Sequence, residues 1–123
     1  MPENNNDIDL TFLYEIADGS DEFIVESITM FLDQSPQIMH QIDTALKAQD
    51  WATASAAAHK VKANLGFFGM LNSQAIIQDI EHTCKAGNPN PIEVIAKFSE
   101  VNGIMNNSLV ELGKIKAEKE ANL

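Results

Sequence analysis

One segment of the sequence combines a potential nucleophile with a nearby cation. It runs from Trp51 to Met70 and reads WATASAAAHKVKANLGFFGM. Neutral imidazole is a competent nucleophile near pH 7, and an ammonium group can neutralise an anion held on it. His59 and Lys62 are three residues apart, so a helix would place them on neighbouring turns of one side. The pair is therefore suited to the transfer of an anionic group.

The helix around His59 is predicted to have an unusually bare outer surface. Its core stripe would consist of Ala54, Ala57, Ala58, Val61, Leu65 and Phe68. His59 lies about 150° from the centre of that stripe and should face outward. Instead of long charged side chains, its surface neighbours are Ala52, Ser55, Ala56, Ala63 and Gly66.

Two further residues support a docking role for this surface. Gly66 costs about 1 kcal/mol in a helix interior, so something other than helix propensity favours it. Phe67 should be exposed on the same side as Ala63, and Phe23 and Met30 could extend the patch from the preceding helix. The alternative is that the alanines are simply good helix formers and His59 is an incidental surface residue.

The elements that must position this segment are all helical. Apolar residues recur at spacings of three and four, and no stretch alternates like a strand. A short helix around Phe12, Leu13 and Ile16 should be followed by one from about Asp21. Ser35-Pro36 is predicted to cap and begin another helix, ending near Asp50. Later helices should cover Trp51 to about Phe67, Ile76 to Cys84, and the stripe from Val94 to Leu112, with breaks at Gly69 and at residues 87–91.

Short connections between amphipathic helices indicate antiparallel neighbours. The predicted fold is therefore all-α: an up-and-down antiparallel four-helix bundle with a short additional N-terminal helix. It should form a single domain over residues 1–123, with residues 1–6 frayed.

Composition limits the classes of function. The chain of 123 residues has a net charge of −10, from 18 acidic and 8 basic residues. Because the lysines are few and dispersed, a nucleic-acid partner is not expected. The single cysteine, Cys84, cannot form an internal disulfide and suits a reducing compartment. No apolar run reaches the roughly 18 residues of a membrane span, and no signal peptide is evident. We therefore expect a cytoplasmic protein.

The residues around His59 resemble the signature of histidine-containing phosphotransfer (HPt) domains. The family typically shows Ala-His-x-Leu-Lys-Gly-Ser and then a glycine, and this chain has Ala58-His59-Lys60-Val61-Lys62-Ala63 with Gly69 ten residues after the histidine. On the next helix, Ile80-Glu81 with Cys84, Lys85 and Gly87 resembles the family's Leu-Glu-x-x-Ala-Arg-x-Gly stretch. The chain departs from the pattern at Ala63, where the glycine is usual, and at Asn64, where a small hydroxyl residue is usual.

The resemblance implies a phosphorelay carrier without an ATP site. A receiver-domain aspartate would deliver a phosphoryl group to His59, at Nε2, and another receiver would take it. Lys62 would stabilise charge, and Glu81 or, second, Gln78 would orient the imidazole. Ser55, Ala56, Ala63, Gly66, Phe67 and Gly69 would form the docking surface. The implied partners are receiver domains and a hybrid sensor histidine kinase. Mg²⁺ would be carried by the receiver, with no cofactor or metal on this chain. The chain would be a monomer.

Other classes of function lack residues that they require. A dimetal bundle enzyme needs inward Glu-x-x-His pairs, but the chain has only Asp79-x-x-His82, and His82 and His40 should face solvent. No Gly-rich phosphate loop is present, so kinase activity is not expected. The remaining alternative is a non-catalytic HPt-like interaction module whose histidine is idle.

Overall fold

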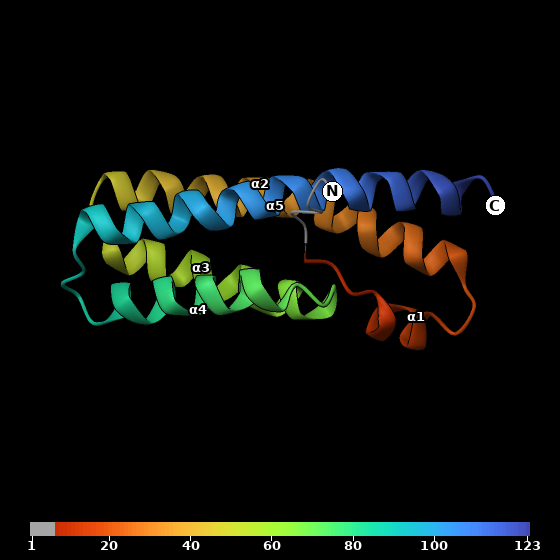
Figure 1. The fold of residues 1–123 in the computed structure, drawn as a ribbon, viewed down its shortest axis with the longest axis horizontal. Coiled ribbons are helices and arrows are strands. Elements are labelled where there is room, and N and C mark those ends of the chain that lie inside the picture. The colour runs from red at the N-terminus through yellow and green to blue at the C-terminus, as the bar shows by residue number, and fades with distance from the viewer. Residues whose placement is uncertain (1–6) are drawn as a thin grey trace, which may run out of the picture.

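A computed structural model of the chain describes residues 7–123, and the predicted fraying of residues 1–6 lies outside them. Within the described part the elements are α1 (Thr11–Ala17), α2 (Asp21–Lys47), α3 (Trp51–Phe67), α4 (Leu71–Lys85) and α5 (Pro91–Glu120). The long helices α2 and α5 lie side by side, and the shorter α3–α4 hairpin packs along one end of them (Figure 1). This confirms the predicted all-α bundle with a short additional N-terminal helix.

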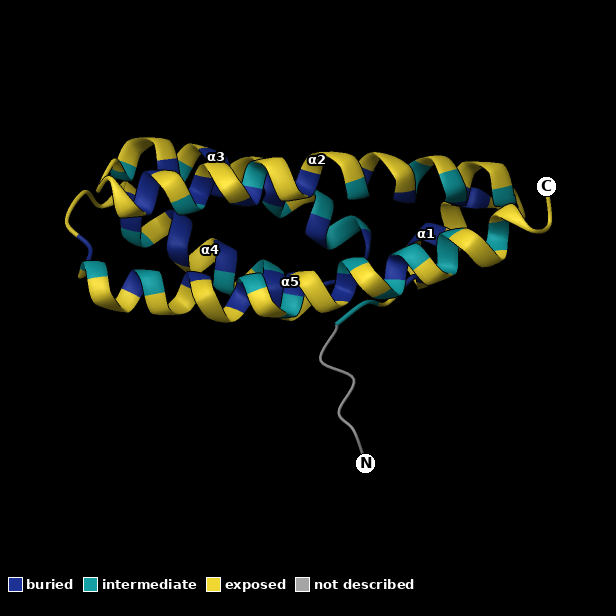
Figure 2. Ribbon diagram, turned by 90° about the horizontal axis from the view of Figure 1, so that it is seen from above, coloured by how far each residue is buried: buried dark blue, intermediate teal, exposed yellow. Residues whose placement is uncertain are grey.

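The core runs along the shared inner side of the four long helices (Figure 2). α2 and α5 extend beyond α3 and α4, and α1 packs against α2 in this extension (Figure 1). Only Leu13 and Ala17 of α1 are buried. Phe12 and Ile16, one turn apart on α1, are 52% and 45% exposed, because so short a helix buries only a narrow side.

The predicted helix start at Ser35-Pro36 was wrong, because α2 continues through both residues. Proline inside a helix costs about 3 kcal/mol, whereas each large buried side chain contributes about 1.5–3 kcal/mol. Buried positions continue without interruption across the proline, namely Ile24, Ile28, Phe31, Ser35, Met39 and Ile42. Ser35 donates its hydroxyl to the Phe31 carbonyl, so a polar residue is accommodated in the core stripe. Continuous packing therefore outweighs the local start signal.

Two helix starts follow the expected chemistry. Asp50 caps α3 by accepting a hydrogen bond from the Thr53 amide and another from the Thr53 hydroxyl. The hydroxyl bond and, to a smaller extent, the amide bond lower the pKa of the Asp50 carboxyl. Asn90 caps α5 in the same way, with Pro91 at the first turn. The Asp50 cap fixes where α3 begins and therefore the register of the face that carries His59.

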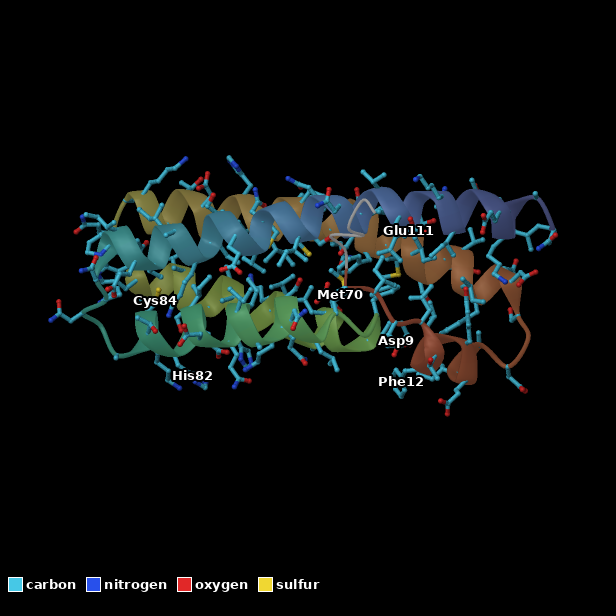
Figure 3. The ribbon with its side chains drawn as sticks, in the orientation of Figure 1. Asp9, Phe12, Met70, His82, Cys84 and Glu111 are labelled. Carbon is cyan, nitrogen blue, oxygen red and sulfur yellow. The ribbon has the colours of Figure 1, made fainter. Side chains whose placement is uncertain are left out.

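The start of α4 is capped from a distant part of the chain. Its own N-cap residue, Met70, offers no side-chain hydrogen bond. Instead Asp7 accepts from the Ser73 amide at 2.8 Å and from the Ser73 hydroxyl at 3.2 Å. Next to it, the Asp9 amide donates to the Phe68 carbonyl at 3.1 Å, which brings Asp9 beside the α3–α4 turn near Met70 (Figure 3). Residues 7–10 therefore hold this turn in place.

Gly69 permits that contact, and we expect Gly69→Ala to destabilise the fold by about 1–3 kcal/mol. Its φ is +68°, and a Cβ there would lie 2.1 Å from the Asp9 carbonyl oxygen. The clash would have to be relieved by moving the N-terminal segment, and the positive φ would strain a residue with a Cβ even then. Thermal unfolding measures the loss, and Gly103→Ala, where a Cβ meets nothing within 4 Å, is the control. Equal stability of Gly69→Ala and the wild type would contradict this role.

Candidate functional site

His59 stands on the outer side of α3, as its position opposite the core stripe predicted. Its side chain is 70% exposed, whereas the stripe residues Ala58 and Val61 on either side are fully buried. Ala56 and Ala63, one turn before and one turn after on its surface, are exposed and small. A partner can therefore reach the ring without displacing bulky neighbours.

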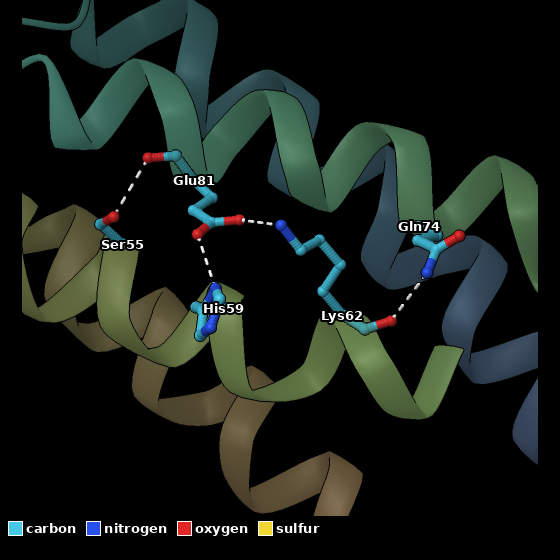
Figure 4. Close-up of polar contacts among 5 residues, drawn as sticks. All are labelled: Ser55, His59, Lys62, Gln74 and Glu81. Carbon is cyan, nitrogen blue, oxygen red and sulfur yellow. Dashed lines mark hydrogen bonds and ion pairs between the residues drawn. The ribbon is translucent and has the colours of Figure 1, made fainter. Parts of the chain in front are cut away.

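Glu81 of α4 holds the inner edge of the ring. Its Oε2 lies 2.8 Å from His59 Nδ1, and its Oε1 accepts a hydrogen bond from Lys62 Nζ at 2.6 Å (Figure 4). Glu81 is only 7% exposed, so both carboxylate oxygens would be poorly solvated without these partners. A single carboxylate therefore joins the imidazole to the cation one turn along.

The charge of Glu81 determines which ring nitrogen carries the proton. The hydrogen bond from Lys62 lowers the pKa of the Glu81 carboxyl, His59 lowers it further, and burial acts in the opposite direction. An ionised carboxylate is acceptor-only, so Nδ1 must be the donor in this contact. In the neutral ring Nε2 then keeps its lone pair. The arrangement leaves the unprotonated nitrogen as the one not engaged by Glu81.

Two other contacts fix α4 against α3 around this group (Figure 4). Ser55, expected in the docking surface, donates its hydroxyl to the Glu81 backbone carbonyl at 3.1 Å. The Gln74 amide Nε2 donates to the Lys62 backbone carbonyl at 3.1 Å. Each tethers the backbone of a residue in the His59–Glu81–Lys62 group.

Gly66 has a structural explanation that the sequence did not suggest. A Cβ at this position would come within 2.7 Å of Gln74 Nε2. The missing side chain therefore makes room for the Gln74 amide, and the cost of glycine in the helix is offset by packing between α3 and α4. Gly69 similarly accommodates the backbone of Asp9. The structure accounts for both glycines without a docking partner.

Gln78, the second candidate for orienting the ring, is exposed, and its side chain makes no hydrogen bond within residues 7–123. Phe67 is partly covered, because the ring of Phe12 packs edge-on against it with centroids 5.8 Å apart. Phe12 is thus the more exposed aromatic of this patch. Met30 and Phe67 line one groove between α2 and α3, while Phe23 is 38% exposed. The sequence placed Ser55 on the docking surface but gave no sign of its bond to Glu81, and it did not predict the contacts of Gln74 and Phe12.

An open depression surrounds the outer side of the His59–Glu81 pair. Its lining includes Trp51, Ala56, Lys60 and Lys85, and the buried Cys84 lies at its floor. Burial raises the pKa of the Cys84 thiol, which disfavours its nucleophilic thiolate form. Of these two groups, the imidazole of His59 is therefore the better candidate nucleophile.

The other two histidines lie elsewhere on the surface. His82 is exposed on the outer side of α4, where it points away from the bundle (Figure 3), and His40 is exposed on α2. In the described part of the chain, no three His, Cys, Asp or Glu side chains gather as a set of metal ligands. None of the helices in residues 7–123 is long and apolar enough to span a membrane.

The comparisons with known proteins agree with this geometry. Residues 26–109, from α2 to the middle of α5, match the Hpt domain family. Comparison with curated proteins and with solved structures gives no match. The matched region contains α3 and α4 entire, and with them His59, Lys62 and Glu81. The chain belongs to the Hpt domain family, whose members carry phosphoryl groups in two-component signalling.

Proposed function

We propose that the chain is a phosphorelay carrier in which His59 accepts a phosphoryl group from a receiver-domain aspartate and passes it to another receiver. The observation that carries this proposal is the His59 ring, 70% exposed at the protein surface, with Nδ1 held by a buried carboxylate. This arrangement leaves Nε2 as the nucleophile. A histidine that served no chemistry would not need a buried carboxylate to orient its ring.

The rest of the reaction calls for positioning and charge stabilisation rather than for a pocket. Phosphoryl transfer proceeds with attacking and leaving oxygen or nitrogen atoms in line, and charge accumulates on the phosphoryl oxygens. The small residues Ala56 and Ala63 allow a receiver to approach His59 closely. Lys62, one turn away, supplies a cation, and the receiver contributes Mg²⁺. The carrier would act as a cytoplasmic monomer, and the receiver domain of a hybrid sensor histidine kinase would supply its phosphoryl group.

The experiment that tests the proposal is a transfer assay. A receiver domain is phosphorylated with acetyl phosphate and Mg²⁺, the chain is added, and acid-labile phosphate is followed on a gel that preserves it. Label should move from the receiver to this chain and then to a second receiver. Binding of the receiver without any transfer of label would support the alternative, a non-catalytic interaction module.

Replacement of the cation should slow transfer. In Lys62→Ala the hydrogen bond to Glu81 Oε1 and the positive charge beside His59 are both lost. We expect the transfer rate to fall about tenfold, which corresponds to about 1.4 kcal/mol, with the fold retained. Transfer reactions stopped at successive times give the rate, and circular dichroism checks that the fold is retained.

Lys60→Ala is the matched control, because Lys60 is exposed beside His59 and lines the same depression without contacting Glu81. It should transfer at nearly the wild-type rate. Equal slowing by both substitutions would show that the position of Lys62 has no special importance.

A further inference from the structure

The group that holds His59 Nδ1 is the charged carboxylate of Glu81, although a neutral acceptor would be enough to orient the ring. A glutamine amide oxygen at position 81 would accept the same hydrogen bond from Nδ1–H. The chain instead places a carboxylate that is 7% exposed, where a charge is costly, and compensates it with Lys62. The geometry thus provides negative charge as well as orientation.

The charge matters because phosphorylation makes the ring cationic. The Nε2 lone pair forms the N–P bond, and the P–O bond of the receiver's aspartyl phosphate breaks with its electron pair on the carboxylate. The Nδ1 proton stays in place, so the phosphorylated ring carries one positive charge. In the onward step a second receiver's carboxylate oxygen attacks phosphorus, and the N–P electron pair returns to Nε2, leaving a neutral ring. If Nδ1 lost its proton first, the leaving group would be an imidazole anion, which is far poorer.

Apart from Glu81, most charged groups facing the ring disfavour that cation. On α3 these are Lys60 and Lys62, and on α4 Lys85 lines the same depression. Asp50 also lines it, but its two carboxylate oxygens accept hydrogen bonds from Thr53. Glu81 is therefore the carboxylate in contact with the imidazole, and it is shared with Lys62.

We propose that Glu81 keeps the proton on Nδ1 of phosphorylated His59 and so extends the pH range over which the phosphoryl group can leave, while Lys62 limits that range by sharing the same carboxylate. Glu81 is a positioning residue in this scheme, because it acts through His59 and does not touch phosphorus. The inference rests on the proposed function, since it presumes that His59 is the carrier.

The test uses the two substitutions with opposite expected signs. The wild-type chain, Glu81→Gln and Lys62→Met are phosphorylated on His59 with phosphoramidate, and the release of phosphate without a receiver is followed from about pH 5 to about pH 10. Release should slow as the ring loses its Nδ1 proton. Relative to the wild type, we expect the midpoint of this decline to fall by about one pH unit or more in Glu81→Gln and to rise in Lys62→Met. Nitrogen NMR of the labelled ring should report the same midpoints.

A control substitution removes a carboxylate from the same helix without touching the ring. Asp79 is exposed on α4 and pairs with Lys97 of α5. Asp79→Asn should leave the midpoint unchanged, which separates a contact effect from a change in net charge.

The outcomes separate the two claims. Equal midpoints in the wild type and Glu81→Gln would overturn the inference and leave Glu81 with orientation alone. If Glu81→Gln does not fold, an unchanged or lowered midpoint in Lys62→Met overturns it equally. Absence of phosphorylation on His59 in the wild type would instead overturn the proposed function.

Discussion

Replacing His59 with glutamine is expected to abolish phosphorylation of the chain while leaving its fold intact. His59→Gln removes the nucleophilic nitrogen, and an amide has no comparable lone pair. The substituted side chain can still donate to Glu81, so the buried carboxylate keeps a partner. Because the position is 70% exposed, the core is not disturbed. The transfer assay should therefore show label on the receiver and only background on this chain.

The other two histidines provide the controls for this experiment. His82→Gln and His40→Gln alter exposed rings that form no hydrogen bond or ion pair with Glu81, and both variants should be labelled like the wild type. Labelling that survived in His59→Gln would move the acceptor to another residue.

A bulky residue next to His59 is expected to block the docking of receivers without changing the reactivity of the imidazole ring. Ala63 is exposed one turn beyond His59, where its small side chain leaves the approach open. In Ala63→Trp the indole would hold a receiver away from the ring. Displacement of reacting groups by about 1 Å can cost 100-fold, so we expect a loss of at least that size in the transfer rate. Phosphorylation of His59 by phosphoramidate should persist, because a small donor needs no docking surface.

Ala96→Trp is the control for the introduction of an exposed indole. Ala96 is an exposed alanine on α5, outside the His59 face. It should transfer at the wild-type rate. If Ala63→Trp transferred equally well, receivers would not dock over this part of α3, and the docking surface would have to be sought elsewhere.

The fold was largely predictable because the helical pattern is strong, but one helix boundary was predicted wrongly. Ser35-Pro36 was interpreted as a helix start, since proline is common at the first helical position. The buried positions Phe31, Ser35 and Met39 are spaced by four and continue across the proline. Because Ser35 is polar, it was not counted as a core position, and the continuity of α2 was missed. Its hydroxyl donates a hydrogen bond to the Phe31 carbonyl, and the local sequence pattern gives no sign of this bond.

In the site, the exposed position of His59 was predictable from helix geometry, whereas the contacts between helices were not. Glu81 was suggested by the family resemblance, and its placement against Nδ1 depends on the register of α4 against α3. Ser55 and Gln74 set that register through bonds to backbone carbonyls. Such bonds leave no periodic signal, although a glycine in mid-helix at Gly66 was a sign that another side chain needed its space.

The capping of α4 by Asp7 has a practical consequence for choosing fragments of this protein. The family match begins at residue 26, so a piece trimmed to residues 26–109 would lack Asp7, the Asp9 contact with the α3–α4 turn, and the Phe12 ring over Phe67. It would also lose the fully buried Leu112 of α5. Bare amides at the beginning of α4 would then loosen the very hairpin that carries both His59 and Glu81. We therefore expect the smallest stable fragment to extend beyond the matched residues at both ends, and slow phosphoryl transfer by a shorter fragment would reflect loss of structure rather than of chemistry.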